Sequence, residues 1–294
     1  MRAVFLAATA AMTFAVAGAA NATTNTVYNS GLGSISPGTT TTDVTGTRSI
    51  NPGGTLAGEV PAFNQWEQQN VRGNGVAGIT TDYARSGNGS IFFSTDGSAP
   101  SKADMEYYFQ TPVLLSQFNG GSYDWLRDGA STINPAPAPA YRLMLASAGG
   151  AYEGYGIWEP YLNDASIPTD TWTTESITAN GSKFWWNNLG VALPAACANR
   201  QACLYTIDDI LNVNTGLVVT GISVGVGSGW TGGTFRGAVD NVSYNFGDDM
   251  TSFNFEVGSA VPEPATWALL ILGFGGVGAA MRHRRRRESQ AAAA

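Results

Sequence analysis

Short apolar runs separated by turn residues constrain the fold of this chain more than any other feature of its sequence. From Gly58 onward, runs of Val, Ile, Phe, Tyr and Trp alternate with clusters of Gly, Asn, Asp, Ser and Pro at intervals of roughly 10 to 15 residues. Within the body, residues 58–258, a helical pattern occurs only in Ile207 to Asn212, which is about two turns at most. The spacing therefore predicts an all-β fold, an antiparallel β-sandwich, and disfavours parallel α/β folds.

The apolar runs mark the strands that we expect. In segment 141–147 the larger apolar residues Tyr141, Leu143 and Leu145 fall at alternate positions, and segment 222–226 has the same alternation, so each gives one core-facing side of a strand. Thr251 to Val257 is expected as an added edge strand. The other expected strands are Val76 to Asp82, Ser90 to Thr95, Met105 to Phe109, Ser122 to Arg127, Tyr155 to Tyr161, Thr171 to Ile177, Phe184 to Asn187, Val218 to Val226, which contains the alternating segment 222–226, and Phe235 to Phe246.

The first 22 residues are typical of a secretory signal peptide. An Ala-rich and weakly hydrophobic stretch, Ala3 to Ala17, is too short to span a hydrocarbon core of ~30 Å. The triplet Ala20-Asn21-Ala22 then predicts cleavage by signal peptidase between Ala22 and Thr23; a permanent N-terminal anchor is the alternative. Residues 23–57, rich in Thr, Ser and Gly, are predicted to form a flexible leader ahead of a β-sandwich domain at 58–258.

Three features follow one another in order at the C-terminal end. Residues 259–264 form a linker with two prolines, residues 265–281 are uncharged and mostly apolar, and residues 282–294 begin with a cluster of Arg. Seventeen residues reach roughly 26 Å as a helix, the lower limit for a membrane span, and the Arg cluster favours a cytoplasmic C-terminus. The sequence therefore predicts one transmembrane helix, 265–281, and a basic cytoplasmic tail, 282–294, with Trp267 at the opposite membrane interface.

The segment Pro262-Glu263-Pro264-Ala265-Thr266-Trp267-Ala268, the Gly-containing stretch around Phe274 and the basic cluster together resemble the PEP-CTERM sorting signal. The resemblance implies that an exosortase of a Gram-negative bacterium recognises the segment around Pro262, Glu263, Pro264 and Trp267 and removes or transfers the tail. It also implies an exported protein, anchored transiently in the inner membrane and then placed at the surface or in the matrix of an exopolysaccharide-producing cell. An ordinary single-pass anchor is the alternative.

Five segments of the body carry a second resemblance: Ser86 to Ile91, Tyr123 to Trp125, Trp158 to Pro160, Gly225 to Trp230 and Ala238 to Val242. They are similar to a globular region that recurs among PEP-CTERM proteins, and this region is itself similar to jelly-roll carbohydrate-binding modules. The resemblance implies a jelly-roll-like sandwich with an exopolysaccharide as a candidate partner.

Composition excludes several classes of function. The single histidine, His283, lies in the basic tail, which excludes Ser-His-Asp and Cys-His catalysis and His-ligated zinc from the body. Between residues 23 and 260 there are nine Lys and Arg against 20 Asp and Glu, a balance that repels nucleic-acid phosphates. Glu153 and Glu159 would lie about 20 Å apart along a strand, too far for a glycosidase pair. We therefore expect no catalysis and no nucleic-acid partner, and we rank a glycoside hydrolase last.

The two cysteines, Cys197 and Cys203, predict a local disulfide in an exported chain, with free thiols or a redox or metal role as alternatives. Asp240, followed by Asn241, offers oxygen ligands for calcium, although Asp and Asn are also the commonest turn residues. We expect no other cofactor.

Tryptophans supply the candidate glycan site. If the body binds a sugar, we expect Trp158, Trp185 or Trp186 to stack on it, and Glu159 or Asn187 to supply polar contacts. Because consecutive strand residues face opposite sides, one of the adjacent pair should be a core residue and the other should be exposed or in a groove. The alternative is that all of these rings fill the core. The first function that we expect is a non-catalytic structural role in the matrix, and the second is polysaccharide binding.

Overall fold

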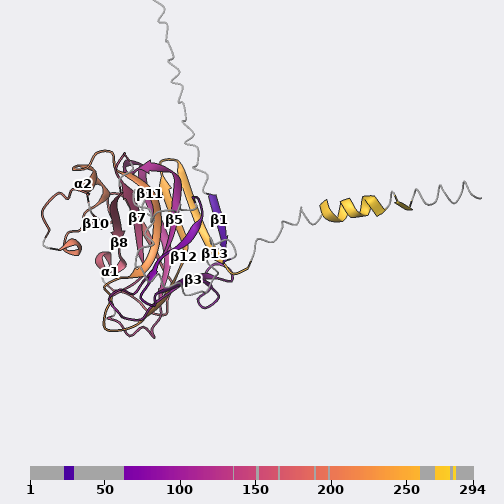
Figure 1. Cartoon of the computed structure of the whole chain (residues 1–294), viewed down its shortest axis with the longest axis horizontal. Coiled ribbons are helices and arrows are strands. Elements are labelled where there is room, and N and C mark those ends of the chain that lie inside the picture. Colours follow the sequence, from indigo (N-terminus) through magenta and orange to yellow (C-terminus); the bar gives the residue numbers. More distant parts are fainter. Residues whose placement is uncertain are drawn as a thin grey trace, which may run out of the picture.

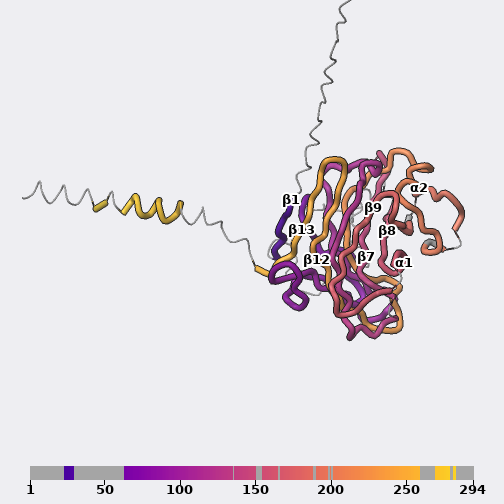
Figure 2. The backbone as a smooth tube through the Cα atoms, turned by 180° about the vertical axis from the view of Figure 1, so that it is seen from behind, coloured from indigo at the N-terminus to yellow at the C-terminus, as the bar shows by residue number. Residues whose placement is uncertain are grey.

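Two β-sheets pack face to face in the computed structural model, which describes residues 23–29, 63–134, 136–149, 152–164, 166–188, 190–197, 199–258, 269–278 and 281–282. Figure 1 shows the two layers, and Figure 2 shows them from behind with β1 beside β13 at one edge. The prediction of a mostly antiparallel β-sandwich is confirmed.

The seven-stranded sheet is organised around its longest central strand, β12 (Phe235–Phe246). One side of β12 pairs with β6, and the other side pairs first with β4 and then with β13. Outer strands β9, β3 and β1 continue from β6, β4 and β13. The bounds of these strands are β1 Thr23–Tyr28, β3 Val76–Thr80, β4 Ser90–Thr95, β6 Phe118–Arg127, β9 Thr173–Thr178 and β13 Asp249–Glu256.

The six-stranded sheet has the order β10-β8-β7-β11-β5-β2, and its paired strands are antiparallel. Its strands are β2 Trp66–Arg72, β5 Lys102–Leu114, β7 Ala140–Ala146, β8 Tyr152–Trp158, β10 Trp185–Asn188 and β11 Val218–Gly227. The short helical elements are η2 Leu115–Gln117, α1 Pro160–Asn163, η3 Arg200–Ala202 and α2 Ile207–Leu211.

Large aromatic and branched side chains fill the space between the sheets. Tyr141, Leu143 and Leu145 point inward from β7 and are each 0% exposed, which confirms the alternation expected for this strand. From the opposite sheet, Phe253 and Phe255 meet the ring of Trp66 edge-on, with centroids 5.3 and 5.2 Å apart. Burial of these surfaces is the main favourable contribution to folding.

Three strands differ from the sequence-based expectation. Thr23–Tyr28, expected within a flexible leader, forms β1, which pairs in parallel with β13. Because β1 adds to its far side, β13 is an interior strand rather than the expected edge strand. Trp66–Arg72 forms β2, which the sequence did not reveal because its buried positions include polar residues; Gln68, for example, donates from Nε2 to the carbonyl of Ala77 at 2.5 Å.

The targeting segments are described only in part. Residues 269–278 of the expected transmembrane segment are helical, and within the described ranges no helix is both long enough and apolar enough to cross a membrane. Pro262, Glu263, Pro264, Trp267 and the expected signal peptide 1–22, including Ala22, lie outside the described residues. Thr23, on the other side of the expected cleavage point, is the first residue of β1.

Asp240 lies where β12 passes from β4 to β13. Its buried carboxylate accepts hydrogen bonds from the backbone N–H groups of Ser86, at 3.1 Å, and Phe255, at 3.0 Å. The carboxylate therefore accepts hydrogen bonds from two backbone N–H groups at the join, the point where β12 passes from β4 to β13. This structural role is distinct from the calcium role considered from the sequence. Among the described residues, no cluster of three or more His, Cys, Asp or Glu side chains could hold a metal ion.

Asp240 should make stability depend on pH. Burial raises its pKa from 3.8 to about 6, and the nearby Asp124 charge adds to the rise. The folded state therefore holds the proton more tightly than the unfolded state, and this contribution to stability is lost as the pH rises from about 4 to about 6. Urea denaturation at several pH values should show that the wild-type free energy of unfolding decreases over this range. In Asp240→Asn we expect this decrease to be smaller by about 1 to 3 kcal/mol. The exposed Asp248→Asn should keep the full decrease, and an unchanged decrease in Asp240→Asn would contradict the assignment.

Candidate functional site: a groove on the six-stranded sheet

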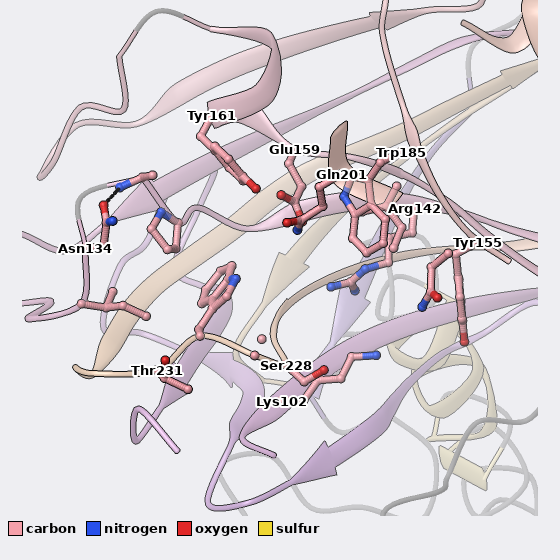
Figure 3. Close-up of a pocket in the computed structure, with 18 residues that line it drawn as sticks. Lys102, Asn134, Arg142, Tyr155, Glu159, Tyr161, Trp185, Gln201, Ser228 and Thr231 are labelled. Carbon is pink, nitrogen blue, oxygen red and sulfur yellow. Dashed lines mark hydrogen bonds between the residues drawn. The ribbon is translucent and has the colours of Figure 1, made fainter. Parts of the chain in front are cut away.

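The face of the six-stranded sheet that points away from the core carries a groove of about 470 Å³ (Figure 3). Strand alternation creates this face, because side chains at 155 and 157 of β8 point outward, as does that of Glu159 just beyond it, while Trp158 points into the core. The register places Arg142 of β7 beside Ile157, and Ile157 beside Trp185 of β10. The floor residues are Lys102, Arg142, Tyr155, Ile157, Glu159, Trp185 and Asn187.

Loops build the walls of the groove. One wall is the connection from β6 to β7, which contributes Ile133 and Pro137, and another is the Gly-rich segment 227–231, which contributes Trp230. The Trp230 ring packs edge-on against Phe235, with centroids 5.2 Å apart. In Figure 3, Glu159, Tyr161 and Gln201 lie on one side of the opening, and Lys102, Ser228 and Thr231 lie on the other.

The cationic side chains of the floor share one carboxylate. Arg142 Nη1 lies 2.7 Å from Asp104 Oδ1, and Lys102 Nζ lies 2.6 Å from Asp104 Oδ2. The contact of Arg142 with Asp104 has the geometry of a hydrogen bond. The contact of Lys102 with Asp104 does not have this geometry and is an ion pair. Lys102 Nζ also lies 5.9 Å from the centre of the Tyr155 ring.

Glu159 and Trp185 bury polar atoms at the same floor. Glu159 is 6% exposed, and neither its Oε2 nor the indole Nε1 of Trp185 has a hydrogen-bond partner of normal geometry among the described residues. Burial raises the pKa of Glu159, while the Arg142 charge and the nearby Trp185 N–H and Tyr161 O–H oppose part of the rise. Buried atoms of this kind cost free energy unless a ligand or water satisfies them.

The structure separates the residues proposed from the sequence into two groups. Glu159, Trp185 and Asn187 line the groove. Trp158 and Trp186 are 2% and 0% exposed and belong to the core, which corrects their proposed role in stacking on a sugar. The alternation expected for the Trp185-Trp186 pair is present, since Trp185 is half-buried at the groove.

Sequence reasoning missed several groove residues. Tyr155 could have been found, because it stands on the same strand face as Glu159. Lys102 and Arg142 come from strands that join the site through β11, and the sequence did not reveal that pairing. The disulfide between Cys197 and Cys203 is confirmed, and Gln201 reaches the groove from the loop that it closes.

Comparison with known families identifies one segment of the chain. Residues 260–286 match the PEP-CTERM protein-sorting motif, which confirms the resemblance seen in the sequence. A search of curated proteins found no match.

Solved structures that match the chain at low similarity include carbohydrate-binding modules. The family 11 module of a cellulosomal cellulase of Clostridium thermocellum is 14% identical, with a TM-score of 0.37 over 68% of this chain and 93% of that chain. A family 28 module specific for non-crystalline cellulose is 12% identical, with a TM-score of 0.32 over 66% and 97%. A β-1,2-glucanase from Parabacteroides distasonis is 10% identical, with a TM-score of 0.33 over 57% and 20%. Similarity at this level carries no argument about ligand or activity.

The adjacent tryptophans should respond differently to truncation. Trp186→Ala removes a fully buried ring and should lower the free energy of unfolding by about 3 to 5 kcal/mol. Trp185→Ala removes a half-buried ring from the groove and should lower it by about 1 kcal/mol. Urea denaturation of both variants tests the contrast, and equal losses would contradict the assignment of the two rings to opposite faces.

Proposed function

We propose that this chain is an exported, non-catalytic protein whose jelly-roll-like β-sandwich binds a polysaccharide in the groove. Its C-terminal segment serves for sorting by an exosortase. Binding comes first in this proposal, and a purely structural role in the matrix comes second, because the groove offers binding groups that a structural role does not require.

One observation carries the binding proposal: an aromatic ring and a buried carboxyl group lie together at the floor of a groove. The Trp185 ring and Glu159 both line the groove, and Glu159 Oε2 and Trp185 Nε1 are buried without a hydrogen bond of normal geometry among the described residues. Trp185 and Tyr161 already lie close enough to oppose the rise of the Glu159 pKa, so a sugar hydroxyl, which both donates and accepts, would reach these atoms after a small movement of the Glu159 side chain. The apolar face of a pyranose ring would cover the indole, and such a mixed surface is typical of small-ligand sites.

The arrangement of carboxylates supports binding without hydrolysis. Glu159 is the carboxylate that lines the groove in the described part of the chain, and the nearby Asp104 is held by Arg142 and Lys102. Glycoside hydrolysis normally uses two carboxyl groups about 5 to 10 Å apart across the scissile bond, one of them protonated. Asp104, ion-paired with two cations, is poorly suited to act as the acid of such a pair, and Glu106, whose pKa burial raises to about 7, is fully buried and does not line the groove.

The match of residues 260–286 to the sorting motif supports the export proposal. The motif, together with the sequence-based signal peptide, implies passage through the inner membrane and processing near Pro262 to Pro264. The cell surface or extracellular matrix is then the place where the groove would meet exopolysaccharide.

The protein should be retained by at least one polysaccharide on an array or in affinity electrophoresis. Trp185→Ala should weaken this binding about tenfold or more, because an aromatic ring at the centre of a site commonly dominates affinity. Trp172→Ala is the matched control: this ring is also half-buried, but it lies beside Arg85 and away from the groove, so binding should persist. Absence of retention by every polysaccharide would favour the structural role, and turnover of a polysaccharide that disappears in Glu159→Gln would overturn both roles.

Sorting makes a separate prediction. Mass spectrometry of the secreted protein, from a host that retains the exosortase, should find a C-terminus upstream of Trp267. Changing Pro262, Glu263 and Pro264 to Ala should leave the tail attached, since the recognised segment is lost. Secretion of intact chain ending at Ala294 in the exosortase-positive host would rule out processing.

A further inference from the structure

The charged groups at the groove are nearly balanced. Lys102 and Arg142 contribute two positive charges, while Glu159, which lines the groove, and Asp104, which pairs with both cations, contribute carboxylates. Glu106, fully buried on the same strand as Asp104, is a third acidic group near both cations, and burial raises its pKa to about 7. Figure 3 shows the Arg142 side chain beside Trp185 and the Lys102 side chain reaching across the floor. A ligand therefore meets a floor with no net positive charge to attract an anion when the carboxyl groups are ionised.

The ion pairs are part of the fold, since the sheet leaves space for them. A Cβ at Gly225 of β11 would overlap Asp104 Oδ1 and come within 2.7 Å of Arg142 Nη1. Ser223, two residues earlier on the same strand, lies 3.4 Å from Arg142 Nη1 through its hydroxyl. Asp104 and Arg142 are 1% and 4% exposed, so separating this pair to bind an anion would leave a buried charge uncompensated.

The Glu159 carboxyl group lies at the floor of the groove. Glu159 Oε2 accepts no hydrogen bond of normal geometry within the described residues, although Glu159 is almost fully buried. The groups that face it are Arg142 from β7, Trp185 from β10 and Tyr161 from α1. The polar residues of the walls, Asn134, Gln201, Ser228 and Thr231, carry no charge. An incoming carboxylate or sulfate would thus approach Glu159 and find both floor cations already paired.

We infer, on the premise that the groove binds a glycan, that its ligands are uncharged glycans and that it rejects chains bearing uronic acid or sulfate groups. Hydroxyl groups can form hydrogen bonds with the Glu159 carboxyl group and the Trp185 N–H, once these side chains move to admit them, without bringing a charge into the floor. An anionic sugar loses its hydration and gains no unpaired cation in return. A cationic amino sugar would have to approach Arg142 and Lys102.

Affinity electrophoresis of the purified full-length protein tests this inference. Gels contain a neutral β-glucan, alginate, polygalacturonate or chitosan at matched sugar concentration and at about 0.15 M salt, where charges far from the groove are largely screened. We expect retention by the neutral polymer with an affinity at least about tenfold higher than for the three charged polymers, equivalent to about 1.4 kcal/mol. Equal or stronger retention by a charged polymer would overturn the charge selectivity and leave glycan binding in place. Retention by no polymer would instead overturn the proposed function.

A variant should weaken the selectivity. Glu159→Gln keeps the shape of the side chain and removes its charge, so the affinity for alginate should rise about fivefold relative to wild type as a local repulsion is removed. Asp208→Asn is the matched control, because it removes one charge from an exposed site on α2 and should leave alginate binding unchanged. An equal rise in both variants, or none in a folded Glu159→Gln, would contradict the role of Glu159. If thermal melting shows that Glu159→Gln does not fold, the wild-type comparison of polymers decides alone.

Discussion

The two hydrogen bonds accepted by Asp240 join the parts of the seven-stranded sheet. On one side, strand β12 pairs first with β4 and then with β13. Where the first pairing ends and the second begins, the backbone N–H groups of Ser86 and Phe255 need hydrogen-bond acceptors, and Asp240 provides them. A buried N–H without an acceptor is costly, so the carboxylate makes this exchange of partners possible. Asn241, in a left-handed conformation with φ of 51°, donates to Ser86 Oγ and to Asp124 Oδ2 at 2.7 Å and ties a third segment to the join.

In the six-stranded sheet, polar and charged side chains must be paired because they are buried, since both faces of this sheet are largely covered. Its inner face carries the aromatic core, and its outer face carries charged groups, including Glu106, which is 0% exposed. Burial raises the pKa of Glu106 to about 7, and Asp104 adds to the rise. Asn70 donates to Glu106 Oε1 at 3.1 Å, and Tyr108 donates to its other oxygen. Buried polar groups on a sheet are tolerated when they are paired in this way.

Sequence patterns predicted the strands whose burial is apolar and alternating. Ser90–Thr95 and Phe235–Phe246 begin and end where the sequence placed them, because each run contains several large apolar residues and is bounded by turn residues. Strand β2 escaped prediction since Gln68, Gln69 and Asn70 are buried through hydrogen bonds and contacts that only the folded sheet supplies. For the site, alternation separated Trp185 from Trp186, but Arg142 and Lys102 required knowledge of which strands pair, and that information is non-local.

The core also determines how well the groove is prepared for a ligand. Gly156 lacks a Cβ that would lie 2.9 Å from the Trp186 ring, so this ring packs closely over β8 and holds β10 against it. Trp185 follows Phe184 and precedes Trp186, both 0% exposed, and its backbone is therefore fixed on both sides. A ring that is already ordered loses little conformational entropy when a ligand stacks on it, which favours binding. The large core residues thus stabilise the sandwich and, through the same short strand, orient the aromatic surface of the groove.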